Sequence, residues 1–397
     1  MQYRLSCLAK HHQIYLAVNV IDAVPCTDQL PCRRSYDHRY YNTEVVFDRR
    51  GCLVAKYHKV NLFMTEKLTL DTPPQPRLSY FDTEFGRFGL MVCFDAVFQT
   101  PAVDLVEKHN VTDIIFSTAW MNVLPHYVSV SFHSGWARTM RVNYISANKH
   151  NEPYRYVGSG VYTPDGILAY TYNQSHGMGG HLVITEVPIN RRQSILWERQ
   201  EVGYERLEVA VNDNSAKFYS LVFGDLFAFR PLRGLSGETS VCHRDVCCSV
   251  TFTRDSDKEL FALGAFDGMH HLEGSYYLQV CLLVKCRNNK LLECGWSTKE
   301  SSTIFSNFNL TGSMTTRYAF PQVVNADWDF SDVWSFKDAG YTKSVIGNSD
   351  HPLLSVVLMG RDFIRDHELD ESDTPLSGGH TPGLSLWLIS MTIVSWI

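Results

Sequence analysis

The order of apolar segments along the 397-residue chain constrains its fold more than any other feature. Up to about Pro188, short apolar segments typical of buried strands alternate with helix-like segments and hairpins. This alternation predicts an α/β layered domain with a mixed sheet. A charged stretch follows, and the sequence then becomes cysteine-rich and strand-like, which predicts a second, mostly β domain. A chain of this length suits two domains better than a single core.

The change in texture predicts four segments. We expect the α/β domain over 1–190, a linker over 191–216, the β domain over 217–370, and a polar spacer with an apolar tail over 371–397. Within the first domain, "DRRG" and "PDG" predict hairpin turns. "TPAVDLVEKHN" predicts a helix with Thr100 as its N-cap and proline at the first helical position.

Eleven cysteines, an odd number, are unevenly spread along the chain. Clusters of this kind indicate either disulfides in an exported protein or a zinc site in a cytosolic one. No CxxC pair accompanies the clusters and His243 is the only histidine beside them, so their spacing favours disulfides. The candidate partners are Cys26, Cys32, Cys242, Cys247, Cys248, Cys281, Cys286 and Cys294. Cys7 and Cys52 lie in helix and strand patterns, which predicts that they are buried thiols.

Other features also point to export. The three glycosylation sequons begin at Asn110, Asn173 and Asn309. The C-terminus is apolar from Leu384 onward and follows a polar stretch rich in small residues, an order that resembles a lipid-anchor signal with attachment at Ser372 or Ser377. The alternative is a buried terminal strand or helix. We therefore expect an extracellular or cell-surface protein, attached to the membrane where the anchor is added.

The N-terminus carries no matching export signal. "MQYRLSCLAKHH" is typical of the last turns of an amphipathic helix, so the simplest hypothesis is that Met1 is an internal methionine. The net charge is −6 and no long basic run is present, which gives no reason to expect nucleic-acid binding.

Two reactive side chains follow predicted strands. Cys93 ends "RFGLMVC" just before a helix, and Lys59 follows "CLVAKYH". A thiol has a pKa of about 8.5, and a nearby ammonium or helix N-terminus stabilises its thiolate. At neighbouring strand ends the pair predicts an activated nucleophile, although spacing alone also fits a structural cysteine and a surface lysine. A papain-like site using His126 or His133, or a redox site, fits less well, because neither motif is present.

Motifs around these residues resemble the nitrilase (carbon–nitrogen hydrolase) superfamily, and specifically its vanin/biotinidase branch. The motifs are "YHKVNLF" (57–63), "GRFGLMVCFDAVFQTPAVDLV" (86–106), "FSTAWMNVLPH" (116–126), and, in the second domain, "VCHRDVCC" and "EGSYYLQVCLLVKC". The resemblance covers nearly the whole chain, with the motifs in the family's order. It implies an αββα sandwich, here without its first strand and helix, followed by a disulfide-rich β domain.

The resemblance also implies the roles of individual residues. Cys93 is the nucleophile that forms a thioester, Lys59 stabilises the oxyanion, and the backbone N–H of Phe94 is a second donor. The family's general base is a glutamate upstream of the helix at which this chain begins, and neither Glu44 nor Glu84 matches its motif. We therefore predict that the chain as written is unstable and inactive, and activity on pantetheine within a few-fold of a complete family member would contradict this.

Further residues are assigned more loosely by the same resemblance. Glu66 matches an auxiliary glutamate of the superfamily. Trp120 and His126 either line the pocket or belong to core and loop, and His58 is structural. The implied activity is hydrolysis of the amide of pantetheine to pantothenate and cysteamine, with a small-molecule amide as partner and neither metal nor cofactor. The alternatives are hydrolysis of biotinyl amides and a catalytically dead secreted glycoprotein.

Overall fold

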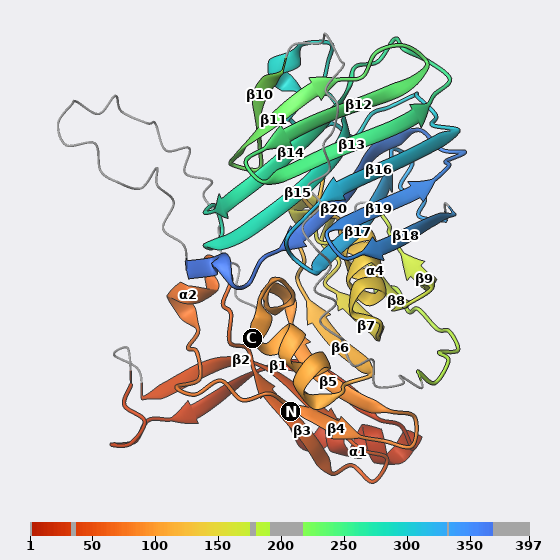
Figure 1. Ribbon diagram of the computed structural model, residues 1–397. Coiled ribbons are helices and arrows are strands. Elements are labelled where there is room, and N and C mark those ends of the chain that lie inside the picture. The colour runs from red at the N-terminus through yellow and green to blue at the C-terminus, as the bar shows by residue number, and fades with distance from the viewer. Residues whose placement is uncertain (1, 33–36, 175–179, 191–216, 332, 368–397) are drawn as a thin grey trace, which may run out of the picture.

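The computed structural model describes residues 2–32, 37–174, 180–190, 217–331 and 333–367 (Figure 1). Elements up to β9, red to yellow in Figure 1, form one group, and elements from β10 onward, green to blue, form a second. The first group contains α1 (Gln2–His12), β1 (Leu16–Pro25), β2 (His38–Phe47), β3 (Leu53–His58), α2 (Glu66–Thr69), β4 (Tyr80–Asp82), β5 (Arg87–Val92), η1 (Cys93–Val97), η2 (Gln99–Val103), α3 (Asp104–His109), β6 (Asp113–Thr118), α4 (Ser129–Met140), β7 (Asn143–Asn148), η3 (Glu152–Tyr154), β8 (Ser159–Thr163) and β9 (Gly166–Thr171).

The first group is layered, because each of its sheets buries one face against the other sheet and one against helices. β1, β2 and β3 form an antiparallel sheet, and β4 to β9 form a six-stranded sheet in which β5, β6 and β7 run parallel. Along β2, Val46 packs against the six-stranded sheet, whereas Val45 and Phe47 belong to the cluster that includes α1. α3 and α4 cover the remaining face. This αββα order confirms the predicted fold class.

The second group is a sandwich of two antiparallel sheets, with strand orders β10-β11-β14-β15-β20-β17 and β12-β13-β16-β19-β18. The first of these sheets is buried on both faces. Along β15, Leu283 faces the five-stranded sheet, whereas Leu282 belongs to the core shared with the first group. The strands are β10 (Phe218–Val222), β11 (Asp225–Pro231), β12 (Ser236–His243), β13 (Val246–Thr253), β14 (Phe261–His270), β15 (Tyr276–Lys285), β16 (Asn307–Ser313), β17 (Tyr318–Asn325), β18 (Trp334–Ala339), β19 (Thr342–Gly347) and β20 (Leu353–Arg361), with short helices η4 (Leu291–Glu293) and η5 (Arg365–His367).

Helix α4 joins the two groups. It packs against the six-stranded sheet of the first group and against β17 of the second. Ser131 Oγ donates to the carbonyl of Val323 at 2.9 Å, and Thr139 Oγ1 donates to the carbonyl of Ala319 at 2.6 Å. A Cβ on Gly135 would lie 2.2 Å from the Pro321 carbonyl oxygen, so glycine permits the close approach of helix and strand.

The eight cysteines predicted as disulfide partners form four disulfides, which confirms the prediction. The pairs are Cys26–Cys32, Cys242–Cys247, Cys248–Cys281 and Cys286–Cys294. The prediction that Cys7 and Cys52 are buried is wrong, since both are exposed. Helix α1 turns Ala9 toward the sheet and Cys7 away from it, and Cys52 lies in the hairpin turn before β3 rather than in the strand.

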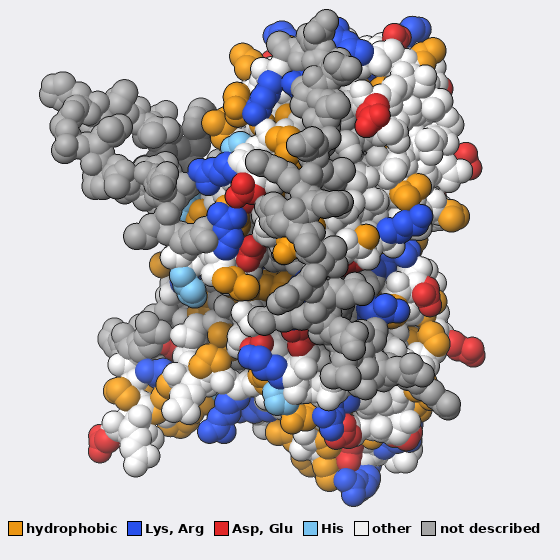
Figure 2. Space-filling view, viewed as in Figure 1, with side chains coloured by type: hydrophobic (Ala, Val, Ile, Leu, Met, Phe, Trp, Pro, Cys, Tyr) orange, Lys and Arg blue, Asp and Glu red, His pale blue; other side chains and the backbone are white. Residues whose placement is uncertain are grey.

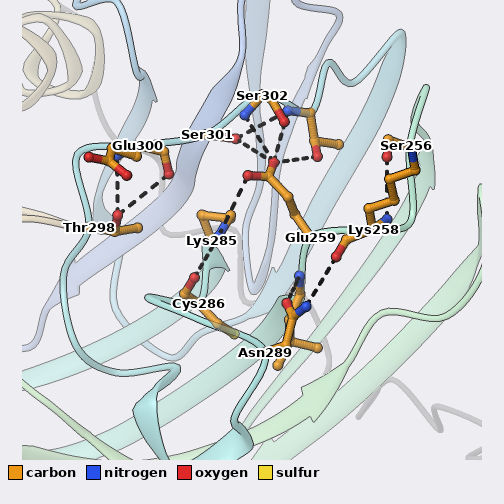
Figure 3. A network of polar contacts seen from close by, with 12 residues as sticks. Ser256, Lys258, Glu259, Lys285, Cys286, Asn289, Thr298, Glu300, Ser301 and Ser302 are labelled. Carbon is orange, nitrogen blue, oxygen red and sulfur yellow. Dashed lines mark hydrogen bonds and ion pairs between the residues drawn. The ribbon is translucent and has the colours of Figure 1, made fainter.

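A polar network fixes the segment after η4 to the loop between β13 and β14 and to the end of β15, all in the second group (Figure 3). Oε2 of Glu259 accepts from the N–H groups of Ser302 and Thr303, both at 3.0 Å, and from Thr303 Oγ1 at 2.6 Å. Lys285 Nζ lies 3.8 Å from Oε1 and donates to the carbonyl of Cys286 at 2.7 Å. The pKa of Glu259 lies below its usual value. Burial alone would raise it, but these hydrogen bonds and the Lys285 charge outweigh the effect of burial.

The hairpins predicted on "DRRG" and "PDG" are confirmed as β2–β3 and β8–β9. The predicted helix start is wrong. Thr100 has an extended backbone (φ −105°, ψ 123°) inside the π-helical η2, and the α-helix α3 begins only at Asp104 with Val103 as its N-cap. The Thr100 hydroxyl donates to the Asp104 carboxylate at 2.6 Å, and the start of α3 has no side-chain cap.

Two predicted segments, 191–216 and 371–397, lie outside the described residues, so the domain boundaries stay predictions. Within the described ranges, none of the helices has the length and apolar character needed to cross a bilayer. On the face shown in Figure 2, acidic and basic side chains are interspersed and do not gather by sign.

Candidate active site

The backbone turns sharply where β5 ends. Val92 is extended (φ −129°, ψ 120°), and the next residue, Cys93, has φ +51° before η1 continues the chain. A non-glycine residue in this left-handed region costs about 1–2 kcal/mol, and it persists only where its surroundings hold it. Cys93 is partly buried and carries a free thiol.

The carboxylate of Asp95 holds this turn. It is fully buried and accepts four hydrogen bonds: from the N–H of Val92 at 3.0 Å, Tyr57 Oη at 2.8 Å, and the N–H and Nδ2 of Asn61 at 3.0 and 2.9 Å. Burial raises the pKa of Asp95, and the Lys59 charge and these bonds oppose that rise. One side chain therefore fastens the end of β5 to the segment that follows β3.

That segment carries Lys59, whose side chain is 1% exposed. Its ammonium forms an ion pair with Oε2 of Glu66, which also accepts from the N–H of Phe63 at 2.8 Å. Oε1 of Glu66 accepts from Asn42 Nδ2 at 2.8 Å. Burial lowers the pKa of Lys59, but the charges of Cys93, Glu66 and Asp95 outweigh it and raise the pKa. The lysine is therefore a fixed cation close to Cys93.

Phe94 follows Cys93 as the second residue of η1. N–H groups at the start of a helix have no partner within that helix, so the N–H of Phe94 occupies a position suited to an oxyanion donor. Its side chain is buried against Phe63, Phe98 and Tyr276, with ring centroids 5.1, 5.0 and 6.2 Å away.

A mostly apolar cavity opens beside the Cys93 thiol. Besides Cys93 it is lined by Phe63, Phe94, Val97, Ala119, Trp120, Met121, Val123, Tyr127, Phe223 and Glu273. Trp120 is thus a pocket residue, and its indole N–H donates to the Tyr127 carbonyl at 2.9 Å. Phe223 and Glu273 come from the second group of elements, so both groups build this wall.

The histidines that the sequence analysis named do not line the cavity beside Cys93. His126 is buried behind Tyr127 and Phe223, outside the residues that line the cavity, and burial together with the His270 charge lowers its pKa to about 3. His133 is buried in α4, and burial lowers its pKa to about 3. His58 stacks on Tyr41 and lies 3.0 Å from Asp22 Oδ2, as a structural residue would.

Three features of the site were not predicted from the sequence. The anchoring role of Asp95 had a signal, since an aspartate two residues after a candidate nucleophile stands in the quoted motif. No sequence signal indicated Phe223 and Glu273. Both are far from Cys93 along the chain, and a contact between distant residues leaves no local pattern. In the ranges that the structure covers, no three His, Cys, Asp or Glu side chains are grouped so that they could hold a metal.

Comparisons with known proteins agree with this geometry. The carbon-nitrogen hydrolase family model matches residues 3–195, and the vanin C-terminal domain model matches residues 216–366. A pantetheinase of Sus scrofa is 40% identical over 402 residues, which cover 100% of this chain and 77% of the relative. A pantetheinase of Homo sapiens is 40% identical over 372 residues (92% and 71%), and a biotinidase of Takifugu rubripes is 35% identical over 341 residues (81% and 67%). The chain therefore belongs to the carbon–nitrogen hydrolase family, in the branch that carries a vanin C-terminal domain.

Proposed function

We propose that this protein is an amidohydrolase of the pantetheinase type, which splits the amide of pantetheine into pantothenate and cysteamine. The observation that carries the proposal is the Cys93 thiol, held at φ +51° at the end of β5 and at the edge of an apolar cavity, with the buried Lys59 close enough for its charge to interact with Cys93. The Sus scrofa and Homo sapiens pantetheinases are 40% identical to this chain and the Takifugu rubripes biotinidase is 35% identical, which supports pantetheine before biotinyl amides as the substrate.

In the proposed reaction the Cys93 sulfur attacks the amide carbonyl carbon. Lys59 and the N–H of Phe94 stabilise the oxyanion that forms on the carbonyl oxygen. The C–N bond then breaks, the amine takes a proton and leaves as cysteamine, and the acyl group remains on Cys93 as a thioester. Water attacks the thioester, which releases pantothenate and restores the thiol.

The thiol proton must pass to a general base. Two described carboxylates act on Lys59: Glu66 is engaged by Lys59, Phe63 and Asn42, and Asp95 accepts four hydrogen bonds. We assign the base to neither, because each already holds a part of the site in place.

The test uses protein expressed from its full reading frame in secretory cells, incubated separately with pantetheine and with biotinyl-lysine. We expect release of pantothenate and cysteamine, measured by mass spectrometry, at a rate well above that of biotin release. Cys93→Ser is expected to lower pantothenate release by several orders of magnitude. Its matched control, Cys7→Ser, changes an exposed free thiol on α1 and is expected to have no effect. Release of biotin alone, or release of neither product while Cys93 remains reactive, would exclude the proposed substrate.

The same protein is proposed to be an exported glycoprotein. Four disulfides among the described residues favour an oxidising compartment. Of the sequon asparagines, Asn110 is exposed at the end of α3, and Asn173 and Asn309 are partly exposed. We expect a loss of mass on treatment with an N-glycosidase, and release from cells by phospholipase if the C-terminal segment is replaced by a lipid anchor. A protein of unchanged mass that stays in the cytosol would contradict this.

A further inference from the structure

The cavity beside Cys93 has one carboxylate on its wall, and that carboxylate comes from the second group of elements. Glu273 lies in the loop from β14 to β15 and is 7% exposed. The next residue, Gly274, lies so close to Phe94 that a Cβ would be 3.1 Å from the ring. The loop is therefore packed directly against the residue that follows Cys93.

The Glu273 carboxylate is held from two sides. Its Oε2 lies 2.6 Å from His270 Nε2, and its Oε1 accepts from the hydroxyl of Tyr276. Tyr276 Oη in turn lies 2.6 Å from the hydroxyl of Tyr127, which lines the cavity. A carboxylate offers about four lone-pair positions, and these two bonds leave the others for the cavity.

The cluster behind the wall carries a net negative charge. His270 is fully buried and its Nδ1 lies 2.8 Å from Asp225 Oδ2, so both ring nitrogens face carboxylates. Burial lowers the pKa of His270, but Asp225 and Glu273 outweigh it and raise the pKa to about 9. One imidazolium between two carboxylates leaves one negative charge in excess.

Neighbouring groups do not cancel that charge. Arg361 lies over the Tyr276 ring at 4.8 Å, but its guanidinium is paired with Asp366 at 2.8 Å. His126, on the other side of Phe223, is neutral because burial lowers its pKa to about 3. The exposed His271, on the same loop, bonds Ser275 at 3.3 Å.

We propose that Glu273 is a specificity-determining residue, whose carboxylate makes the cavity beside Cys93 reject amides with an anionic amine portion. The inference rests on the proposed amidohydrolase function and deepens it. A cavity lined mostly by apolar side chains suits a small uncharged group such as the cysteamine portion of pantetheine. A carboxylate on that group would meet Glu273 in a water-poor site, where repulsion between like charges is stronger than in water.

Two substrates that differ by one carboxylate test the inference. Pantetheine and N-pantothenoyl-cysteine share the acyl portion, and the second carries an extra carboxylate on the amine portion. The measured quantity is the ratio of their kcat/KM values, which does not depend on the fraction of folded enzyme. We expect the wild type to prefer pantetheine, and Glu273→Gln to reduce that preference by about tenfold or more.

Two variants separate the effect of the Glu273 charge from the effect of the side-chain packing and hydrogen bonds around it. Glu273→Asp keeps the charge and Tyr276→Phe removes the phenol that donates to Glu273, and both are expected to retain the preference for pantetheine. An unchanged ratio in Glu273→Gln, or equal cleavage of both substrates by the wild type, would overturn the inference even where a variant folds poorly. Cleavage of neither substrate by the wild-type protein expressed from its full reading frame would instead contradict the proposed function.

Discussion

At the scale of single residues, Asp95 joins three parts of the candidate site. Asp95→Asn replaces an oxygen that accepts two hydrogen bonds with an amide group that donates, so two buried donors lose their partner. We expect the free energy of unfolding to fall by about 2–4 kcal/mol, measured by urea denaturation. The positive φ of Cys93 should relax as well, which would change the rate at which iodoacetamide alkylates the thiol.

The matched control is Asp82→Asn. This carboxylate is 66% exposed and pairs with Arg87 at the surface. Its loss is expected to cost less than about 1 kcal/mol and to leave the alkylation rate unchanged. Equal losses of stability in the two variants would show that Asp95 does not anchor the turn.

Glu44 is a second buried carboxyl group, on the inner face of β2. Ser117 Oγ donates to its Oε1 at 3.0 Å, and Oε2 has no hydrogen-bond partner among the described residues. Burial raises its pKa from 4.5 to about 7, with Ser117 opposing the rise. The folded state therefore binds this proton more tightly than the unfolded state. The resulting stabilisation is complete below pH 4.5 and is lost as the pH rises through 7.

Glu44→Gln removes the ionisable group and therefore the loss of stability at high pH. We expect the variant to be more stable than the wild type by about 1–3 kcal/mol at pH 8 and to differ by less than about 1 kcal/mol at pH 5, measured by denaturant unfolding at both values. Glu84→Gln is the control, because Glu84 is 48% exposed and pairs with Arg49. A gain from Glu44→Gln that is the same at both pH values would contradict the assigned protonation.

The sequence placed Cys93 and Lys59 correctly at strand ends, because the order of apolar and reactive residues is local information. The auxiliary Glu66, suggested by resemblance, does contact Lys59. A local sequence pattern does not show which side of a helix or turn packs against a sheet. The exposure of Cys7 was therefore not predicted. Glu273 was missed for a related reason, since only folding brings the second group to the cavity.

At the scale of elements, the contact between α4 and β17 depends on the absence of a side chain. Gly135→Ala would place a methyl group 2.2 Å from the carbonyl oxygen of Pro321, a backbone atom that cannot rotate away. The helix must then shift from the strand, which disturbs the bonds of Ser131 and Thr139. We expect a loss of about 2–4 kcal/mol in the free energy of unfolding, measured by urea denaturation.

Gly237→Ala is the control for this substitution. Gly237 lies in β12, where a Cβ would find no atom nearer than 3.9 Å. The expected change is within about 1 kcal/mol of the wild type. If both glycines tolerate alanine equally, the closeness of α4 and β17 does not limit stability.

The hairpins and buried strands were predicted from sequence because turn residues and apolar runs are short-range signals. The start of α3 was predicted wrongly. Thr100 and the proline after it match the sequence pattern of an N-cap, but the α-helix begins only at Asp104. The π-helical turn that delays the helix is set by packing, with Pro101, Ala102 and Val103 all buried. The bond from Thr100 to the Asp104 carboxylate then replaces the expected backbone cap.

At the scale of the whole molecule, the two groups of elements share one apolar core. Trp136 on α4 packs on Phe320 of β17, and both belong to the same cluster as Leu282 of β15. Arg361 at the end of β20 donates to the carbonyl of Val97 at 2.7 Å, and Val97 is the last residue of η1, the helix that begins at Cys93. Melting either group alone would expose this core and leave these polar groups unpaired.

We therefore expect the two groups to unfold in a single cooperative transition, although multidomain proteins commonly do not. Scanning calorimetry should give a calorimetric enthalpy equal to the van't Hoff enthalpy. Tryptophan fluorescence, to which the buried Trp120 and Trp136 contribute together with tryptophans of the second group, should follow the same curve as far-UV circular dichroism, which the strands of both groups dominate. Gly135→Ala should move this transition to lower temperature without splitting it. Two separated transitions in the wild type would show that the groups are stable independently, and the loop bearing Glu273 would then have to be positioned by the second group alone.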